Sequence, residues 1–315
     1  MDENQIVRKQ KGGGKMEERK YKIGIVGLGL IGGSFARALV QNTQHIVYGF
    51  DLSENVLHDA LQDGSVYKAA RLKDEVCLED ASALLSECDL VFVALYVYGT
   101  VAFVKQYAHV FPKGCLVVDL CGLKEYVCES LAEYDGCGSH FTFIGGHPMA
   151  GREVAGYQNS VETLFRGASM ILSPPASVTA ETIGLLSELF YQVGFAHIEI
   201  TDAARHDRII AFTSQLAHVV SSAYIKSPTA REHMGFFAGS YQDMTRVAKM
   251  NEAMWSDLFI LNRRNLISEI DSVIEHLEEY KNALRLADRD ADLSKERINA
   301  LIIDGTQIKK TLDES

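Results

Sequence analysis

The histidine in residues 145–151, which read Gly-Gly-His-Pro-Met-Ala-Gly, could act as a general base. This segment directly follows an apolar run that predicts a β-strand, and open α/β sheets bind ligands at the carboxyl ends of their strands. An imidazole placed there can accept a proton while hydride leaves a neighbouring carbon, because its pKa lies near neutrality. An arbitrary histidine is more often a capping or core residue, but the loop context favours the catalytic interpretation of His147.

A glycine-rich turn could hold the phosphates of a dinucleotide. It consists of Gly27, Leu28, Gly29, Leu30, Ile31 and Gly32, and it lies between a predicted strand at 22–26 and a predicted helix at 33–41. Gly27 permits the tight turn, Gly29 lets the backbone approach a pyrophosphate, and Gly32 lets the helix pack close to the strand. Asp51, which ends the next predicted strand, would accept hydrogen bonds from the adenosine ribose. Since no arginine follows it immediately, the pattern predicts NAD rather than NADP.

Two segments of the second half carry polar side chains that could line a cleft. Ser214 and His218 lie four residues apart on a predicted helix and share one face, which could equally be a solvated face. Residues 243–246, Asp-Met-Thr-Arg, end in Arg246, whose guanidinium could bind a carboxylate bidentately. A surface Arg–Asp pair explains this segment equally well. For His206, which begins the same helix as Ser214, a purely structural role beside Asp207 stays open.

The elements that must position these groups are read from the apolar pattern. Apolar runs without polar alternation predict strands buried on both faces of a parallel sheet. They lie at 22–26, 45–50, 90–95, 115–120, 141–146 and 168–172. Helical segments separate them, and after a helix at 178–193 and a short segment at 197–200 only helical spacing remains. We predict a Rossmann-type, doubly wound, mainly parallel sheet followed by an all-α domain.

The predicted domain organisation has three parts. Residues 1–20 form a tail without apolar periodicity, residues 21–190 form the dinucleotide-binding domain, and residues 191–315 form the helical domain. Helices with leftover apolar faces usually bury them against a partner, and a two-fold dimer is the common solution. We therefore expect a homodimer.

Composition excludes several classes of protein. The chain has 315 residues and a formal net charge of −11, which argues against a general nucleic-acid binder but not against small anionic ligands. No stretch approaches the roughly 18 consecutive apolar residues that span a membrane. The six cysteines are scattered and form no Cys-x-x-Cys pair, so we predict no metal site and a cytoplasmic protein with reduced cysteines.

In this order and spacing, the glycine turn, His-Pro-Met-Ala-Gly, Ser-x-x-x-His and Asp-Met-Thr-Arg together resemble the prephenate/arogenate dehydrogenase family of tyrosine biosynthesis, from about residue 21 to about residue 300. The resemblance implies a Rossmann domain with an all-helical dimerisation domain. It also implies oxidative decarboxylation, in which NAD+ accepts hydride and the ring carboxylate leaves as CO2. The resemblance assigns the catalytic histidine to His147, the arginine that binds the substrate carboxylate to Arg246, and the second substrate-side histidine to His218, with Ser214 beside it.

The chain departs from the family pattern at two positions. Many members carry a serine in an Asp-x-Gly-Ser-x-Lys segment, but here residues 119–124 read Asp-Leu-Cys-Gly-Leu-Lys, so Gly122 offers no hydroxyl. Water, Ser214 or a backbone group would have to replace it. Tyr96 stands where many members have proline.

Recognition of the substrate side chain stays open between prephenate, a keto acid, and arogenate, an amino acid. Either Arg152 or Glu153 could point into the site, and a carboxylate would favour the ammonium group of arogenate. By analogy with NAD-using members we favour prephenate. A β-hydroxyacid dehydrogenase is the more distant alternative, but the helical half lacks the Gly-x-x-Gly-x-Gly segment that precedes the catalytic lysine of that class.

Overall fold

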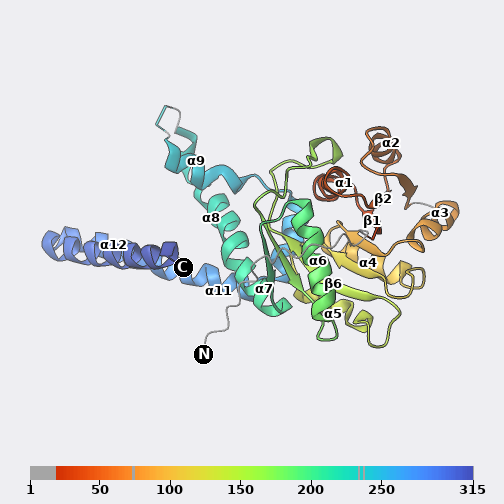
Figure 1. Ribbon diagram of the computed structural model, residues 1–315. Coiled ribbons are helices and arrows are strands. Elements are labelled where there is room, and N and C mark those ends of the chain that lie inside the picture. The colour runs from red at the N-terminus through yellow and green to blue at the C-terminus, as the bar shows by residue number, and fades with distance from the viewer. Residues whose placement is uncertain (1–18, 73–74, 233–234, 237, 315) are drawn as a thin grey trace.

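A computed structural model describes residues 19–72, 75–232, 235–236 and 238–314, without the side chains of residues 75–79. The tail predicted at residues 1–20 therefore lies almost wholly outside the described residues. The described chain has a rounded α/β body at one end, from which helices project (Figure 1).

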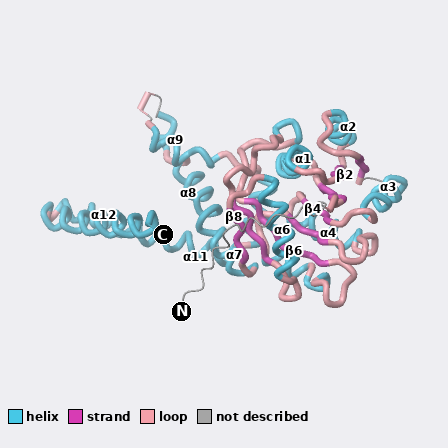
Figure 2. Tube along the Cα trace, viewed as in Figure 1, coloured by secondary structure: helices cyan, strands magenta, loops and turns pink. Residues whose placement is uncertain are grey.

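One sheet of eight strands forms the centre of the described α/β body, in the order β3-β2-β1-β4-β5-β6-β7-β8. Its strands gather in the middle of this body, between helices (Figure 2). The strands are β1 (Lys22–Val26), β2 (Ile46–Asp51), β3 (Lys68–Arg71), β4 (Leu90–Val93), β5 (Leu116–Asp119), β6 (Thr142–Pro148), β7 (Ser169–Ser173) and β8 (His197–Ile200). Neighbouring strands run parallel, apart from the antiparallel pair β6 and β7. The order 3-2-1-4-5 is that of a dinucleotide-binding fold, which confirms the predicted fold class.

Helices cover both faces of the sheet because both faces of its strands are apolar. The helices of the body are α1 (Leu30–Asn42), α2 (Glu54–Gln62), α3 (Glu75–Leu85), α4 (Val97–Tyr107), α5 (Glu125–Ser130) and α6 (Ala180–Val193). α1, α2 and α6 contribute to the core on one face, and α3, α4 and α5 contribute to the core on the other. The first core contains Phe35, Phe92 and Phe190, whose ring centroids lie 4.6 to 6.1 Å apart. Burial of each such side chain stabilises the fold by roughly 1.5–3 kcal/mol.

The sheet ends at β8, and the rest of the described chain is helical. β8 pairs with β7 and ends at Ile200, so the sheet continues past residue 190, where we expected the dinucleotide-binding domain to end. The helices are α7 (Ala203–Ile210), a π-helical turn (Ala211–Leu216), α8 (Ala217–Tyr224), α9 (Gly239–Thr245), α10 (Glu252–Leu261), α11 (Arg263–Arg285) and α12 (Ala291–Glu314). No helix among the described residues is long and apolar enough to cross a membrane.

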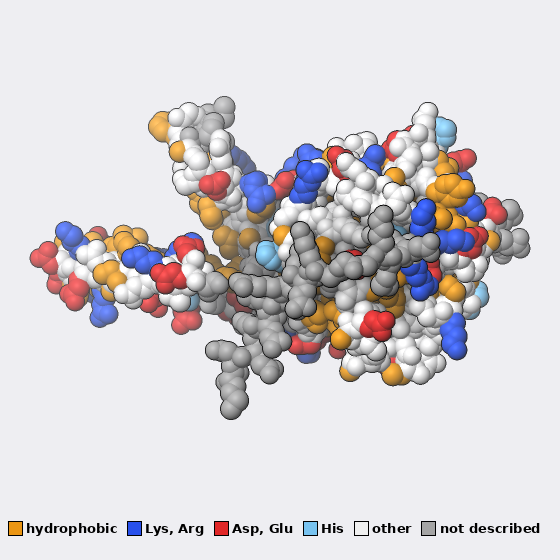
Figure 3. Space-filling model, in the orientation of Figure 1, with side chains coloured by type: hydrophobic (Ala, Val, Ile, Leu, Met, Phe, Trp, Pro, Cys, Tyr) orange, Lys and Arg blue, Asp and Glu red, His pale blue; other side chains and the backbone are white. Residues whose placement is uncertain are grey.

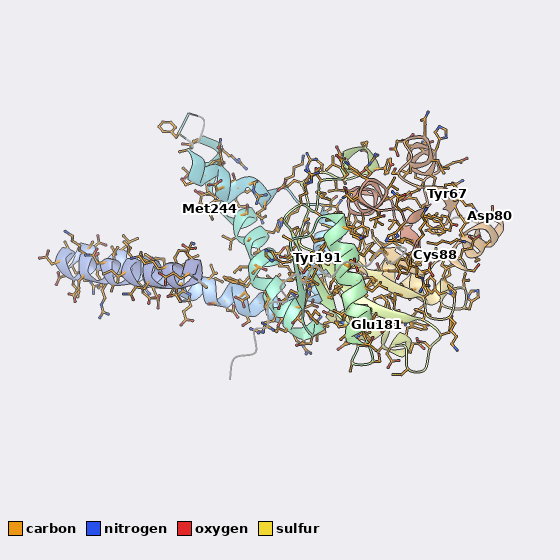
Figure 4. The ribbon with its side chains drawn as sticks, viewed as in Figure 1. Tyr67, Asp80, Cys88, Glu181, Tyr191 and Met244 are labelled. Atoms are coloured by element: carbon orange, nitrogen blue, oxygen red, sulfur yellow. The ribbon has the colours of Figure 1, made fainter. Side chains whose placement is uncertain are left out.

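Two helical arms project from the body. α8 and α9 form one, on which Met244 is 45% exposed (Figure 4). α11 and α12 pack against one another and form the second arm (Figure 1). Hydrophobic side chains lie among charged ones on its surface (Figure 3). Burial within this chain alone therefore does not explain why apolar residues recur at helical spacing in α11 and α12.

Candidate active site

The turn between β1 and α1 brings backbone close to backbone and leaves one side open. Gly27 has a φ of +83°, and a Cβ there would lie 2.6 Å from the Ala94 carbonyl oxygen. A Cβ on Gly32 would lie 1.9 Å from the Gly27 carbonyl oxygen, whereas one on Gly29 would meet nothing within 4 Å. Gly27 and Gly32 are therefore required by packing within the chain. The open space at Gly29 is what a bound pyrophosphate would need.

The N-terminus of α1 suits an anion. Its N-cap residue, Gly29, makes no side-chain capping bond, and no acidic residue stands in the first turn. The free N–H groups and the helix dipole therefore favour a negative ligand at this point. Leu28, Leu30 and Ile31 bring apolar side chains to this turn, so they offer a polar ligand only their backbone groups.

Asp51 lies beside this turn at the end of β2. One carboxylate oxygen accepts a hydrogen bond from the Leu28 N–H at 2.8 Å, and the other accepts one from the Ser53 N–H at 2.8 Å. The strand register also places Arg71, at the end of β3, opposite Asp51, and its Nε donates to the Leu52 carbonyl at 3.2 Å. Sequence reasoning missed this arginine because it does not follow Asp51 along the chain. Only recognition of β3 as a strand would have revealed it.

His147 lies on β6 and is hydrogen-bonded to a second histidine. Its Nδ1 is 2.9 Å from Nε2 of His206, and Nδ1 of His206 is 2.6 Å from Oδ1 of Asp207. The Asp207 carboxylate accepts further bonds from the backbone N–H groups of Lys124 and Glu125, at 2.8 and 2.9 Å. A continuous line of hydrogen bonds thus runs from His147 to the N-terminus of α5.

The surroundings keep His147 neutral. Burial, followed by the neighbouring His206 and the Lys124 ammonium, holds the pKa of His147 well below its ordinary value of 6.5. A neutral imidazole at neutral pH has a lone pair on one ring nitrogen and can accept a proton. This is the protonation state that a general base requires.

The loop after β5 faces the other nitrogen of His147. A Cβ on Gly122 would lie 4.0 Å from Nε2 of His147 and 3.9 Å from the methyl groups of Leu258 on α10. Asp119 and Lys124, at the two ends of this loop, form an ion pair whose side chains are fully buried. Asp119 also accepts a bond from the Gly146 N–H at 3.0 Å, so the loop is fixed to β6 directly before His147.

The helical half contributes a second group of polar side chains. Nδ1 of His218 is 2.8 Å from the Val247 carbonyl oxygen, and its ring lies against Trp255 of α10 with centroids 3.9 Å apart. Burial lowers the pKa of His218, against the opposing effects of the Val247 carbonyl and the Glu153 carboxylate. Arg246 forms an ion pair with Glu153, in which both side chains are exposed. Of the two candidates that follow the His147 segment, Glu153 is therefore the one that reaches the arginine.

Ser214 lies in the π-helical turn between α7 and α8 and is partly exposed. Such turns are rare and occur frequently at functional sites. α10 connects the two groups, since Leu258 lies near Gly122 and Trp255, one turn earlier, lies against His218. The two halves of the chain thus contribute to one region.

Models of two families match most of the chain. The model described as "Prephenate dehydrogenase, nucleotide-binding domain" matches residues 35–199, and the one described as "Prephenate dehydrogenase, dimerization domain" matches residues 202–296. The chain belongs to the prephenate dehydrogenase family.

Curated relatives and solved structures agree with this assignment. A cyclohexadienyl dehydrogenase of Zymomonas mobilis is 30% identical over 275 residues, which cover 85% of this chain and 90% of the relative. A prephenate dehydrogenase of Bacillus subtilis is 26% identical over 280 residues, with coverage of 87% and 72%. The structure of a prephenate dehydrogenase from A. aeolicus, in complex with hydroxyphenyl propionate and NAD+, has a TM-score of 0.78 at 24% identity and covers 94% of this chain and 99% of its own. This last likeness shows the same fold.

Among the described residues, no group of three or more His, Cys, Asp or Glu side chains could hold a metal ion. The five cysteines whose side chains are described are free. A cavity of about 300 Å³ lies at the amino ends of β1 and β4, where it is lined by Arg19, Asp89 and Lys113 among others. His147 lies at the carboxyl ends of the parallel strands, so the cavity is on the opposite side of the body.

Proposed function

We propose that this member of the prephenate dehydrogenase family catalyses the NAD-dependent oxidative decarboxylation of prephenate to 4-hydroxyphenylpyruvate. The observation that carries the proposal is the state of His147, which lies at the carboxyl end of a Rossmann sheet. Its pKa is lowered by burial, its Nδ1 is bonded to His206, and its Nε2 faces the loop at Gly122. These features suit a base that removes a proton from a bound substrate.

The residues of the first turn fit NAD. The open space at Gly29 and the uncapped N-terminus of α1 would accommodate the pyrophosphate, with Gly27 and Gly32 holding the turn. Asp51, at the end of β2, would accept hydrogen bonds from the adenosine ribose. When bound, the nicotinamide would supply the hydride acceptor for the reaction.

His147 would accept the proton of the ring hydroxyl at Nε2 while hydride leaves the carbon that bears this hydroxyl. Loss of the ring carboxylate as CO2 then makes the ring aromatic as a phenolate, and His147 would return the proton to the phenolate oxygen. The lowered pKa keeps the imidazole neutral and ready for this proton.

Arg246, His218 and Ser214 would bind the substrate. In a chain with a net charge of −11, a carboxylate substrate needs a fixed cation, and the guanidinium of Arg246 can bind it bidentately. His218 is held by the Val247 carbonyl through Nδ1, so Nε2 is left to face a ligand.

Arogenate is a second candidate substrate, and the Glu153–Arg246 pair favours it. The carboxylate of Glu153 could pair with the ammonium of arogenate while Arg246 binds the neighbouring carboxylate. Both substrates would undergo the same proton and hydride transfers.

The chain would act as a homodimer. Support comes from the match to the dimerization domain model and from exposed apolar side chains on α11 and α12, including Leu277 at 62% and Ile303 at 56% exposure. A cytoplasmic location stays a prediction from the sequence.

The deciding experiment measures the absorbance of the reduced cofactor with prephenate or arogenate, each with NAD+ or NADP+. We expect turnover with prephenate and NAD+, and a loss of roughly two to four orders of magnitude in His147→Asn. Preference for arogenate would keep the mechanism and reverse the substrate. Absence of turnover with both substrates would refute the proposed activity.

A further inference from the structure

We propose that His206, held by Asp207, is the positioning residue that fixes the tautomer of His147 and takes up the proton that His147 removes. This inference rests on the proposed role of His147 as the base. It assigns a function to two buried side chains that α7 places behind the base.

The geometry leaves His206 with a single orientation. The two side chains of His206 and Asp207 are 0% and 4% exposed. Both ring nitrogens of His206 are in contact, one with Asp207 at 2.6 Å and the other with His147 at 2.9 Å. Asp207 itself is fixed by the backbone N–H groups of Lys124 and Glu125. Asn262 further holds this segment, since its side-chain amide donates to the Asp207 carbonyl at 2.8 Å.

The positions of the hydrogens follow from the carboxylate at the end of this line. The Asp207 carboxylate already accepts two backbone N–H groups, and an ionised carboxylate has no hydrogen to donate. Nδ1 of His206 must therefore carry the hydrogen, which leaves Nε2 of a neutral His206 as an acceptor. His147 must then donate from Nδ1, so its lone pair lies on Nε2. This is the nitrogen that faces Gly122 and the space in front of it.

Gly122, on the opposite side of the ring, cannot perform this orientation, because glycine has no side chain. The contact with His206 is the hydrogen bond that the structure gives to the His147 ring. An imidazole held by one nitrogen keeps the other aimed in a constant direction. His206 and Asp207 therefore orient the imidazole ring of His147.

The same line can move a proton. When Nε2 of His147 takes the substrate proton, the hydrogen on Nδ1 can pass to Nε2 of His206. His206 then carries the positive charge, directly against the Asp207 carboxylate, and His147 is neutral again. Lys124 near His147 disfavours a positive charge on that ring, although the ammonium is paired with Asp119. When the ring carboxylate leaves as CO2, the product forms as a phenolate, and the proton returns by the same route, from His206 through His147, to its oxygen, so that no net proton is released.

The test compares His206→Leu, which removes both functions, with His206→Gln, whose carbonyl oxygen can still accept from Nδ1 of His147. We expect kcat with prephenate and NAD+ to fall by about 100-fold or more in the leucine variant and by about 10-fold in the glutamine variant, because the contribution of a positioned base is of this order. KM for prephenate should stay within about threefold. Tyr157→Phe, which removes a buried hydroxyl on the far side of the sheet from α5, is the matched control and should keep kcat.

NMR of the histidine ring nitrogens in the substrate-free wild type gives a readout that needs no turnover. We expect the hydrogen of His147 on Nδ1, and a mixture of tautomers in the leucine variant. A hydrogen on Nε2 of His147 in the wild type, or a kcat within twofold of wild type in a folded His206→Leu, would overturn the inference. If the leucine variant does not fold, the wild-type spectrum and the glutamine variant decide. Failure of the wild type to turn over prephenate would instead refute the proposed function, while the tautomer assignment would stand or fall by its own measurement.

Discussion

Among single residues, His147 has an environment in the folded chain that differs strongly from water. Burial and the neighbouring His206 and Lys124 disfavour its charged form, so its pKa in the folded state lies well below 6.5. This pKa shift affects both the pH dependence of the reaction and the pH dependence of the free energy of unfolding.

The first prediction concerns pH. Since the pKa of His147 in the folded chain is lowered, kcat/KM should decrease at acid pH with a midpoint below pH 6.5. The unfolded chain takes up this proton first, so the free energy of unfolding should be retained above pH 6.5 and decline as the pH drops from 6.5 towards the folded pKa. A pH–rate profile and urea denaturation at several pH values measure both effects. His147→Asn should reduce the pH dependence of unfolding, and an unchanged dependence in that variant would contradict the assignment.

The second prediction concerns the space at Gly122. A Cβ there makes only ordinary contacts, at 3.9 to 4.0 Å, and the backbone is not in the left-handed region, so Gly122→Ala should fold normally. The branched side chain of Gly122→Val would enter the space in front of Nε2 of His147 and displace the substrate. We expect kcat/KM for prephenate to fall by about 100-fold, the effect of a displacement of about 1 Å. Binding of NAD+, measured by calorimetry, should be unchanged, and an active valine variant would show that this space is not the substrate's.

At the scale of elements, local patterns predicted the strands that are mostly apolar, including β1, β4 and β5, because strands buried on both faces appear in the sequence as nearly continuous apolar runs. β3 was missed, since its four residues, Lys-Ala-Ala-Arg, have little strand propensity and their pairing with β2 is a tertiary effect. The π-helical turn at Ser214 has no local signature that we could read. Only the structure shows that this turn lies between α7 and α8.

The candidate site shows the same division. Sequence motifs named His147, Ser214, His218 and Arg246, and the structure places each of them as described above. The contacts of His147 with His206, and of Arg246 with Glu153, join residues that lie far apart in the chain. No periodicity encodes such pairs. The adjacency of His206 and Asp207 was the available signal, and alone it could not distinguish a catalytic from a structural role.

The third prediction concerns the junction of β5 and β6. Lys124→Met would leave the buried carboxylate of Asp119 without its cation, and removal of one partner of a buried pair costs roughly 3–5 kcal/mol. Urea denaturation should report this loss in the free energy of unfolding. Lys22→Met, which breaks the exposed pair with Glu87, is the matched control and should leave the free energy of unfolding nearly unchanged. Equal losses in the two variants would mean that the buried pair does not stabilise the junction.

At the scale of the whole molecule, the proposed site draws on both halves of the chain. α10 reaches the Gly122 loop with Leu258, and Arg246 reaches Glu153 from the helical half. The second arm begins beside the site, because α11 packs against the π-helical turn that carries Ser214. Its far part, with α12, points away from the sheet (Figure 1). Its apolar surface therefore needs an explanation other than substrate binding.

The fourth prediction concerns this arm. Ile267, Ile274, Leu277 and Leu284 of α11 are 52 to 62% exposed, and their spacing of seven, three and seven residues places them on one stripe of the helix. In a two-fold dimer a change in this stripe acts twice, so Leu277→Glu with Leu284→Glu alters four side chains, each worth roughly 1.5–3 kcal/mol when buried. We expect the wild type to sediment as a dimer at micromolar concentration and the double variant as a folded monomer.

Ser272→Glu on the same helix is the control for added negative charge and should remain dimeric, because its side chain is exposed and lies outside this stripe. A double variant that stays dimeric would place the interface elsewhere. If the double variant is a monomer and also loses turnover, a site assembled with help from the second subunit is indicated, since none of the altered side chains contacts His147 or Arg246 within the chain. If it is a monomer with full turnover, each chain carries a complete site and the arm serves assembly alone.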